Sequence, residues 1–275
     1  MELDNIIYPG FNKTLSELNA ISKIKKKSCE IVDLTEIEWV RDVLRHRVEE
    51  VGTYDIKFRK PTDEEIKSVS EIVGADINID ELKNNFHKNK RIIGITSGKG
   101  GVGKSTITSL LGIAFDELGK KVGIMDSDIW GYSVPKILGA KFPPIPFNER
   151  IFPSRINNLN VISMDYFVKQ DEAVIWRGPM LHKAIEQFLF EVLWHDIDVL
   201  LIDMPPGTGD VSISLSQFLK YFENIVVTTP QTNATIVAER SGIMSKKVNA
   251  SIIGVIENMS YICLLYTSDA ADEIA

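Results

Sequence analysis

The feature that most constrains this fold is a glycine-rich loop between a predicted strand and a predicted helix. Residues 98–105 read GKGGVGKS and match the pattern G-x-x-x-x-G-K-[ST] in full. An apolar run at residues 91–97 precedes the loop, and residues 104–119 repeat apolar side chains at intervals of three and four. A strand, this loop and a helix in that order are typical of a phosphate-binding loop, in which backbone N–H groups and the positive end of the helix hold a polyphosphate.

The residue types in the loop predict its contacts with a nucleoside triphosphate. Lys104 is placed to bridge the outer phosphates, Ser105 to hold Mg²⁺ and Thr106 to contact the α-phosphate. The remaining predicted contacts come from Gly98, Lys99, Gly100, Gly101, Val102 and Gly103. The alternative is a flexible glycine turn with a surface lysine, and it leaves the flanking strand and helix unexplained.

Three aspartates follow apolar runs that we expect to lie beside the loop. Asp203 ends the run at residues 198–203, where a carboxylate can hold Mg²⁺ directly or through water. Asp126 and Asp128 lie at the end of a preceding apolar run, at residues 121–126, where they are candidates to orient or polarise an attacking water, and Asp126 is also a candidate magnesium ligand. An aspartate at a strand end can instead only cap a turn.

Apolar strands separated by amphipathic helices predict an α/β fold of the P-loop NTPase type, with a mostly parallel sheet flanked by helices. Right-handed crossovers then place the active loops at the carboxyl ends of the strands. The proline-rich segment at residues 140–158 interrupts the alternation and is expected to be an irregular surface excursion. The other expected strands are 121–126, 198–204, 224–230 and 251–258, and the other expected helices are 179–194, 211–222 and 232–248.

The pattern of apolar residues in 1–62 differs from that of the rest of the chain and predicts a small α/β domain. Strand-like runs at 18–24, 29–34 and 54–58 surround a predicted helix at 36–52. The remaining boundaries that we expect are a linker at 63–90, a P-loop ATPase domain at 91–262 and a foreign or disordered tail at 263–275.

The charge balance argues against a polyanionic partner. The chain has 31 basic and 38 acidic residues, a formal net charge of -7, so no global basic field draws it to nucleic acid or to acidic lipid. The amino-terminal residues lack a basic region followed by an apolar run, and no stretch is apolar for long enough to span a bilayer. We therefore expect a cytoplasmic protein with no nucleic-acid and no membrane partner.

Several separated motifs resemble one known family. SGKGGVGKST, with its additional lysine Lys99, resembles the deviant Walker A ATPases, which include MinD, ParA and the nitrogenase iron protein. Together with GKKVGIMDSDIWGYSVP, VIWRGPMLHKAIEQFL, DVLLIDMPPGTGD, VVTTPQ and GVIENMSYI, it resembles the Mrp/ApbC subfamily of iron–sulfur cluster carrier ATPases over residues 91–262. Residues 1–60 more loosely resemble the MIP18-type domain that often precedes that ATPase.

The resemblance implies a homodimer that binds and hydrolyses ATP with Mg²⁺ and that assembles iron–sulfur clusters or transfers them to client apoproteins. In the family, the additional lysine reaches the partner's nucleotide, so Lys99 would neutralise phosphate charge across the dimer. Asp128 then matches the aspartate that positions water, Asp203 the Walker B aspartate, and Asn258 the residue that hydrogen-bonds adenine. Two alternatives use the same loop: a MinD/ParA-like positioning ATPase that binds membrane or DNA, and a phosphotransferase of the tyrosine-kinase type.

The cysteines depart from the family pattern. Relatives commonly continue after ENMSY with a C-x-x-C pair whose thiolates hold a bridging cluster. Here Cys263 is the first residue of the segment CLLYTSDAADE, and no second cysteine follows it. This segment is expected to be foreign to the protein, and a genuine but divergent terminus is the alternative. Cys29 has no sequence partner and is expected to be structural, so the sequence identifies no iron–sulfur ligand.

Overall fold

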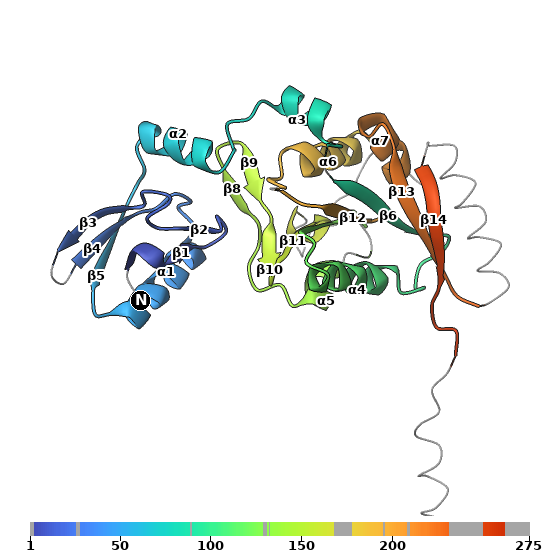
Figure 1. The fold of residues 1–275 in the computed structure, drawn as a ribbon, viewed down its shortest axis with the longest axis horizontal. Coiled ribbons are helices and arrows are strands. Elements are labelled where there is room, and N and C mark those ends of the chain that lie inside the picture. Colours follow the sequence, from blue (N-terminus) through green and yellow to red (C-terminus); the bar gives the residue numbers. More distant parts are fainter. Residues whose placement is uncertain are drawn as a thin grey trace, which may run out of the picture.

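The structure is a computed structural model that describes residues 3–25, 28–88, 90–128, 131, 133–167, 178–194, 196–207, 210–230 and 250–261. Figure 1 shows a smaller amino-terminal sheet beside a larger sheet with helices on both faces. The predicted α/β class with a mostly parallel sheet is confirmed. The predicted helix at residues 232–248, Cys263 and the tail at 263–275 lie outside the described residues.

The amino-terminal part is built around a three-stranded sheet in the order β3-β4-β5. β3 and β4 pair antiparallel, while β4 and β5 pair parallel and are joined by the crossover helix α1, so the three strands and the helix that the sequence predicts are present. The buried side chains of α1, Val40, Leu44 and Val48, recur every four residues, which turns one stripe of the helix toward the sheet. The elements of this part are η1 (Leu3–Asn5), β1 (Ile7–Tyr8), β2 (Lys13–Thr14), β3 (Ile21–Lys25), β4 (Ser28–Val32), α1 (Glu38–Val51) and β5 (Asp55–Arg59).

Two helices, α2 (Asp63–Ile72) and α3 (Ile79–Asn85), connect the small sheet to the large one. Thr62 and Glu65 form a capping box at the start of α2, in which each side chain accepts from the other residue's backbone N–H. Arg59, the last residue of β5, donates to both carboxylate oxygens of Glu65. The division of the chain into domains and a linker stays a prediction.

The large sheet has seven strands in the order β10-β11-β7-β12-β6-β13-β14. Only the β10–β11 pair among the described strands of this sheet is antiparallel. Its strands are β6 (Arg91–Ser97), β7 (Val122–Asp126), β10 (Ser154–Ile156), β11 (Leu159–Ser163), β12 (Val199–Asp203), β13 (Phe222–Thr228) and β14 (Ala250–Glu257). Its helices are α4 (Lys104–Glu117), α5 (Val134–Leu138), the 3-10 turn η2 (Met164–Phe167), α6 (Gly178–Phe190) and α7 (Asp210–Phe218).

Each face of this sheet carries its own hydrophobic core. Along the fully buried strand β12, Leu200 and Ile202 pack with α6 and α7, while Val199 and Leu201 pack with α4 and α5. Successive side chains of a strand point to opposite faces, so a strand that is covered on both sides is apolar throughout. Figure 1 shows the two helix pairs on opposite sides of the sheet.

The expectation for the proline-rich segment at residues 140–158 is wrong. This segment forms the antiparallel hairpin β8 (Ile145–Phe147) and β9 (Arg150–Phe152), followed by the sheet strand β10. Phe147 and Phe152 are buried, and both pack against Phe11 of the amino-terminal part. The prolines suggested a coil, but Pro146 occupies an exposed position in a two-stranded hairpin, where a missing N–H is tolerated.

Two further details differ from the sequence-based expectation. The helix predicted at 179–194 ends at Phe190, because Val192 leaves the helix to bridge with Ile151 of the hairpin. β11 had not been expected at all. No helix in the part of the chain that the structure describes is both long and apolar enough to cross a membrane.

Candidate nucleotide-binding site

The carboxyl ends of three adjacent parallel strands bring the candidate residues together. β6 leads into the glycine loop, while its neighbour β12 ends at Asp203 and the next strand β7 ends at Asp126. Asp203 and Asp126 are register partners, so the two carboxylates stand side by side. Parallel strands that end at one edge are where α/β proteins bind ligands, because the loops there converge.

The glycine loop surrounds an open cavity of about 360 Å³. Gly101 and Gly103 have φ angles of +77° and +83°, a left-handed conformation that favours glycine. Added Cβ atoms at Gly100 and Gly101 would meet nothing within 4 Å, so the backbone there faces open space. The predicted residues that line the cavity are Lys99, Gly100, Gly101, Gly103, Lys104, Ser105, Thr106 and Asp128, whereas Gly98, Val102, Asp126, Asp203 and Asn258 are not part of its lining.

Lys104 is the buried cation of the site. Its side chain is 6% exposed, and its Nζ lies 2.7 Å from Asp203 Oδ1 and 3.6 Å from Asp128 Oδ2. An ammonium group that is buried to this extent requires counter-charges, and the two aspartates supply them. Its position in the first turn of α4 places it in the lining of the cavity.

Asp203 is fully buried and accepts hydrogen bonds from three side chains of α4. Lys104 Nζ lies at 2.7 Å, Ser105 Oγ at 2.5 Å and Thr108 Oγ1 at 3.2 Å. Burial raises the pKa of Asp203, while the positive charge of Lys104 opposes that rise. The three donors therefore favour the ionised carboxylate that a metal site needs.

The donor set fits Mg²⁺ that is shared with a nucleotide. Ser105 Oγ and Asp203 Oδ2 are two hard oxygen atoms within hydrogen-bond distance of each other. Among the described residues, no three His, Cys, Asp or Glu side chains are arranged to hold a metal ion by themselves. A site with one carboxylate and one hydroxyl suits Mg²⁺, which usually completes its coordination with phosphate oxygens and waters.

Asp126 is fully buried and binds the segment that follows β7. Its Oδ2 accepts from Ser163 Oγ at 3.0 Å and from the backbone N–H groups of Ser133 and Val134, and its Oδ1 accepts from the N–H of Asp128. Burial raises the pKa of Asp126 to about 7, and the neighbouring charge of Asp203 adds to the rise. This geometry anchors the loop that carries Asp128, and the role of Asp126 as a magnesium ligand stays a prediction.

The variant Asp126→Asn is expected to flatten the pH dependence of stability between about pH 4 and pH 7. In the folded protein, Asp126 keeps its proton up to about pH 7, whereas the unfolded chain releases it near the ordinary value of 3.8. Raising the pH across this window therefore destabilises the wild type by roughly a few kcal/mol relative to the variant. Urea unfolding over a pH series measures the difference, with Asp80→Asn on the exposed first turn of α3 as the control. Parallel curves for the wild type and Asp126→Asn would contradict the raised pKa.

Asp128 and Asn258 both lie close to residues of the glycine loop. Asp128 lines the cavity, and its Oδ1 accepts from the N–H of Gly131 at 3.1 Å. Asn258 follows β14, and its Nδ2 donates to the carbonyl of Val102 at 2.9 Å, while a Cβ at Gly103 would clash with the same Nδ2. Asn258 therefore fixes the conformation of the glycine loop, and its contact with adenine stays a prediction.

Comparison with known proteins identifies the family. The model of the NUBPL iron-transfer P-loop NTPases, within the ParA group, matches residues 88–272, which is more than half of the chain. The protein belongs to this family. The match confirms the resemblance that the motifs indicated, and it extends past Cys263.

Two curated relatives of this NUBPL-type P-loop NTPase share one name. An iron-sulfur cluster carrier protein of Mycobacterium leprae is 48% identical over 170 residues, which cover 62% of this chain and 44% of the relative. A protein of the same name from Helicobacter pylori is 35% identical over 269 residues, which cover 95% of this chain and 72% of the relative. This chain thus spans less than half of the length of the mycobacterial relative.

Two solved structures have a similar fold. A nucleotide-binding protein of Archaeoglobus fulgidus in complex with ADP aligns with a TM-score of 0.56 and 31% identity, covering 72% of this chain and 83% of that chain. The kinase domain of the Escherichia coli tyrosine kinase ETK aligns with a TM-score of 0.50 at 15% identity, covering 74% of this chain and 79% of that chain, and shows similarity of fold alone.

The sequence reasoning missed three hydroxyl groups in the site of this P-loop NTPase. Thr108 bonds Asp203, Ser163 bonds Asp126, and Ser127 Oγ donates to the backbone carbonyl of Asp203 at 2.7 Å. Thr108 could have been found, because it lies four residues after Lys104 on the same face of a predicted helix. Ser163 could not, because its strand β11 had not been expected.

Proposed function

We propose that this protein binds and hydrolyses ATP and carries iron–sulfur clusters to client apoproteins in the cytoplasm. The observation that carries the proposal is the convergence of Lys104 and Ser105 on Asp203 beside an open glycine loop. The family supports this reading, as do relatives that are named iron-sulfur cluster carrier proteins. The reaction, the cargo and the clients of this chain are parts of the proposal.

In the proposed reaction the loop N–H groups bind the phosphates of ATP, and Lys104 neutralises charge on the outer ones. Ser105 and Asp203 would hold Mg²⁺, which supplies further charge neutralisation when bound. Asp128 lines the cavity close to Lys104 and is placed to orient an attacking water. The anchor that Asp126 provides holds the Asp128 loop at the mouth of the site.

Lys99 is proposed to act across a homodimer. Ser97 Oγ donates to the Lys99 backbone carbonyl at 2.9 Å, which fixes the loop at this residue, and Lys99 lines the cavity. A lysine at the rim of one subunit can approach the phosphates of a second subunit when two cavities face each other. Dimer formation would then be coupled to nucleotide binding.

The cluster is cargo in this proposal, and the described residues supply no cluster ligand. Cys29 is 2% exposed within the core of the amino-terminal part, and burial raises the pKa of its thiol. A buried thiol that is held protonated is a poor iron ligand, because iron binds the thiolate. Any thiolate ligand would have to come from Cys263, outside the described residues, from a partner or from a small thiol.

Anaerobic reconstitution with iron and sulfide, combined with an ATPase assay, tests the proposal on the whole chain. We expect Mg²⁺-dependent ATP turnover, together with bound iron and sulfide that transfer to an apoferredoxin. A lower iron content in Cys263→Ser would identify Cys263 as a ligand, whereas an unchanged content would leave a partner or a small thiol as the source, and the matched variant Cys29→Ser should leave the iron content unchanged. ATP turnover without cluster uptake would reject the carrier role, and ATP-dependent binding to acidic vesicles or to DNA in the same experiment would favour a positioning ATPase.

A further inference from the structure

Two cavities adjoin between the amino-terminal part and the strands β8 to β10. The first has a volume of about 480 Å³ and the second about 460 Å³. Both are lined by Gly10, Asn12, Pro153 and Arg155, so they meet at these residues. We call the combined surface the basic groove. Neither cavity includes a residue of the glycine loop.

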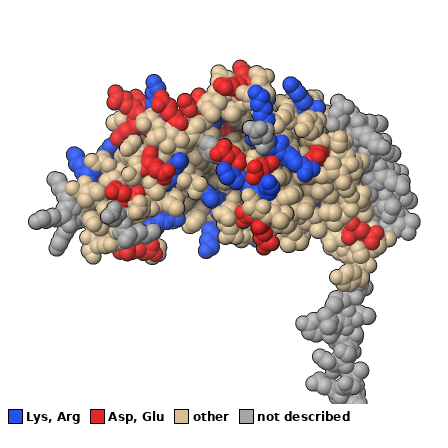
Figure 2. All heavy atoms as spheres, viewed as in Figure 1, with Lys and Arg blue, Asp and Glu red and all other residues tan. Residues whose placement is uncertain are grey.

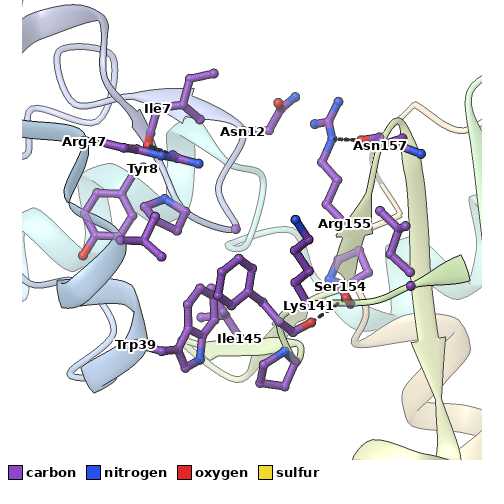
Figure 3. Close-up of a pocket in the computed structure, with 18 residues that line it drawn as sticks. Ile7, Tyr8, Asn12, Trp39, Arg47, Lys141, Ile145, Ser154, Arg155 and Asn157 are labelled. Carbon is purple, nitrogen blue, oxygen red and sulfur yellow. Dashed lines mark hydrogen bonds between the residues drawn. The ribbon is translucent and has the colours of Figure 1, made fainter. Parts of the chain in front are cut away.

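One end of the basic groove is apolar and aromatic. Trp39 of α1 stacks on Phe142, which precedes β8, with ring centroids 4.6 Å apart and an interplanar angle of 14°. Phe142 is 41% exposed, so this pair presents apolar surface to a ligand. Figure 3 shows Trp39 and Ile145 together at this end of the cavity.

Cations surround the rest of the first cavity. Its charged lining residues are Arg47, Lys141 and Arg155, with no Asp or Glu. Arg47 donates to the carbonyl of Ile7 at 2.5 Å and Arg155 to that of Asn157 at 3.1 Å, and these bonds orient both guanidinium groups. In Figure 3, Lys141 extends between the two walls, with Arg47 and Arg155 beyond it on either side.

The second cavity continues the positive surface. Lys120 and Lys121 line it together with Arg155, and its two carboxylates belong to Asp116 and Asp196. Asp116 accepts from Asn158 Nδ2 at 3.3 Å, and Asp196 Oδ2 lies 3.8 Å from Lys121 Nζ. Cations therefore outnumber carboxylates along the groove in a chain whose acidic residues outnumber its basic ones.

We propose that the basic groove binds an extended acidic peptide segment of another protein. An apolar side chain of the peptide would pack on Trp39, Phe142 and Ile145, while its carboxylates would face Arg47, Lys141 and Arg155. The inference goes beyond the proposed ATPase and carrier function, because it concerns a separate surface. It holds whether or not the glycine loop hydrolyses ATP.

The shape and charge of the groove favour a peptide over other anions. A compact metabolite would fill one cavity, whereas an extended chain can follow two cavities that adjoin. Figure 2 shows acidic and basic side chains interspersed over one face of the molecule, without the broad basic surface that a nucleic-acid backbone requires. An apolar end beside a cationic one suits a segment that alternates acidic and apolar residues.

Fluorescence anisotropy tests the proposal with a fluorescein-labelled peptide of alternating glutamate and leucine. We expect binding that weakens with salt, and no binding of the matched peptide of alternating lysine and leucine. The double variant Lys141→Glu/Arg155→Glu should weaken the affinity by about tenfold or more through charge reversal. The control Lys57→Glu/Lys67→Glu makes the same charge change at two exposed lysines of β5 and α2, outside the groove, and should leave the affinity unchanged.

Thermal unfolding of each variant verifies that its fold is intact before affinities are compared. A second variant, Phe142→Ala, should weaken the glutamate–leucine peptide but not a peptide of alternating glutamate and serine. Equal affinities for the wild type and the Lys141→Glu/Arg155→Glu variant would overturn the proposal, as would absence of peptide binding. Tighter binding of a single-stranded oligothymidylate, lost in the same double variant, would assign the groove to nucleic acid instead.

Discussion

Replacing Lys104 with alanine is expected to abolish ATP binding, with an affinity at least ~100-fold weaker than that of the wild type, because charge-assisted bonds to two phosphates are lost. The ammonium group lies in the lining of the cavity, where it balances Asp203 and Asp128. Without it, the two carboxylates also repel the phosphates. Isothermal titration calorimetry with ATP and Mg²⁺ measures the loss.

The same substitution is expected to lower the free energy of unfolding by about 3 kcal/mol, because it leaves Asp203 buried without its cation. Binding must therefore be measured at a temperature where the variant remains folded. Lys104→Met serves as the matched variant, since it keeps most of the side-chain volume without the charge, and it should fail to bind ATP in the same way. An unchanged affinity in either folded variant would reject the glycine loop as the nucleotide site.

Replacing Lys99 with alanine is expected to lower ATP turnover by ~1,000-fold or more, the range of a charge that acts in trans on a transferring phosphoryl group. ATP affinity should change much less, because Lys104 and the loop N–H groups remain. Phosphate release under saturating ATP measures turnover, and calorimetry measures affinity. Lys57→Ala on β5 is the control for loss of an exposed lysine.

Mixing two inactive variants separates action within one subunit from action across a dimer. In a mixed dimer of Lys99→Ala and Asp128→Ala, one site combines an intact Asp128 with a Lys99 from the other subunit. Turnover should therefore recover on mixing if Lys99 acts across the dimer. If both residues serve the same subunit, every site lacks one of them and the mixture stays inactive, which would contradict the proposed role.

Much of the large sheet could be predicted, because its strands carry a strong local signal. β6, β7 and β12 each contain an unbroken apolar run, at residues 92–95, 122–125 and 199–202, and covering a parallel sheet on both faces requires that pattern. The hairpin β8–β9 could not be predicted, since Ile145 and Phe152 become buried only against a part of the chain that is distant in sequence. Its prolines locally favour a coil, but the tertiary contact with the amino-terminal part stabilises the hairpin instead.

For the candidate site too, some features could be predicted from the sequence and others could not. Lys104 and Ser105 follow from the loop motif and Asp203 from the end of an apolar run, and the structure places Lys104 and Ser105 each within hydrogen-bond distance of Asp203. The hydrogen bond from Asn258 to the loop carbonyl of Val102 was not foreseen, because it depends on where β14 ends. Lys99 lies where the motif puts it, but its action on a second subunit stays a prediction.

The sequence by itself determined the glycine loop, the strands β6, β7 and β12 and the helix α4 around it, and the family. These properties depend on residue types at short spacing, where backbone conformation and hydrophobic periodicity act locally. Only the tertiary structure decided the burial of Asp126, the pKa of its carboxyl group and the basic groove formed by Trp39, Lys141 and Arg155. Desolvation and charge density depend on which distant segments meet, and no local pattern in this chain encodes that.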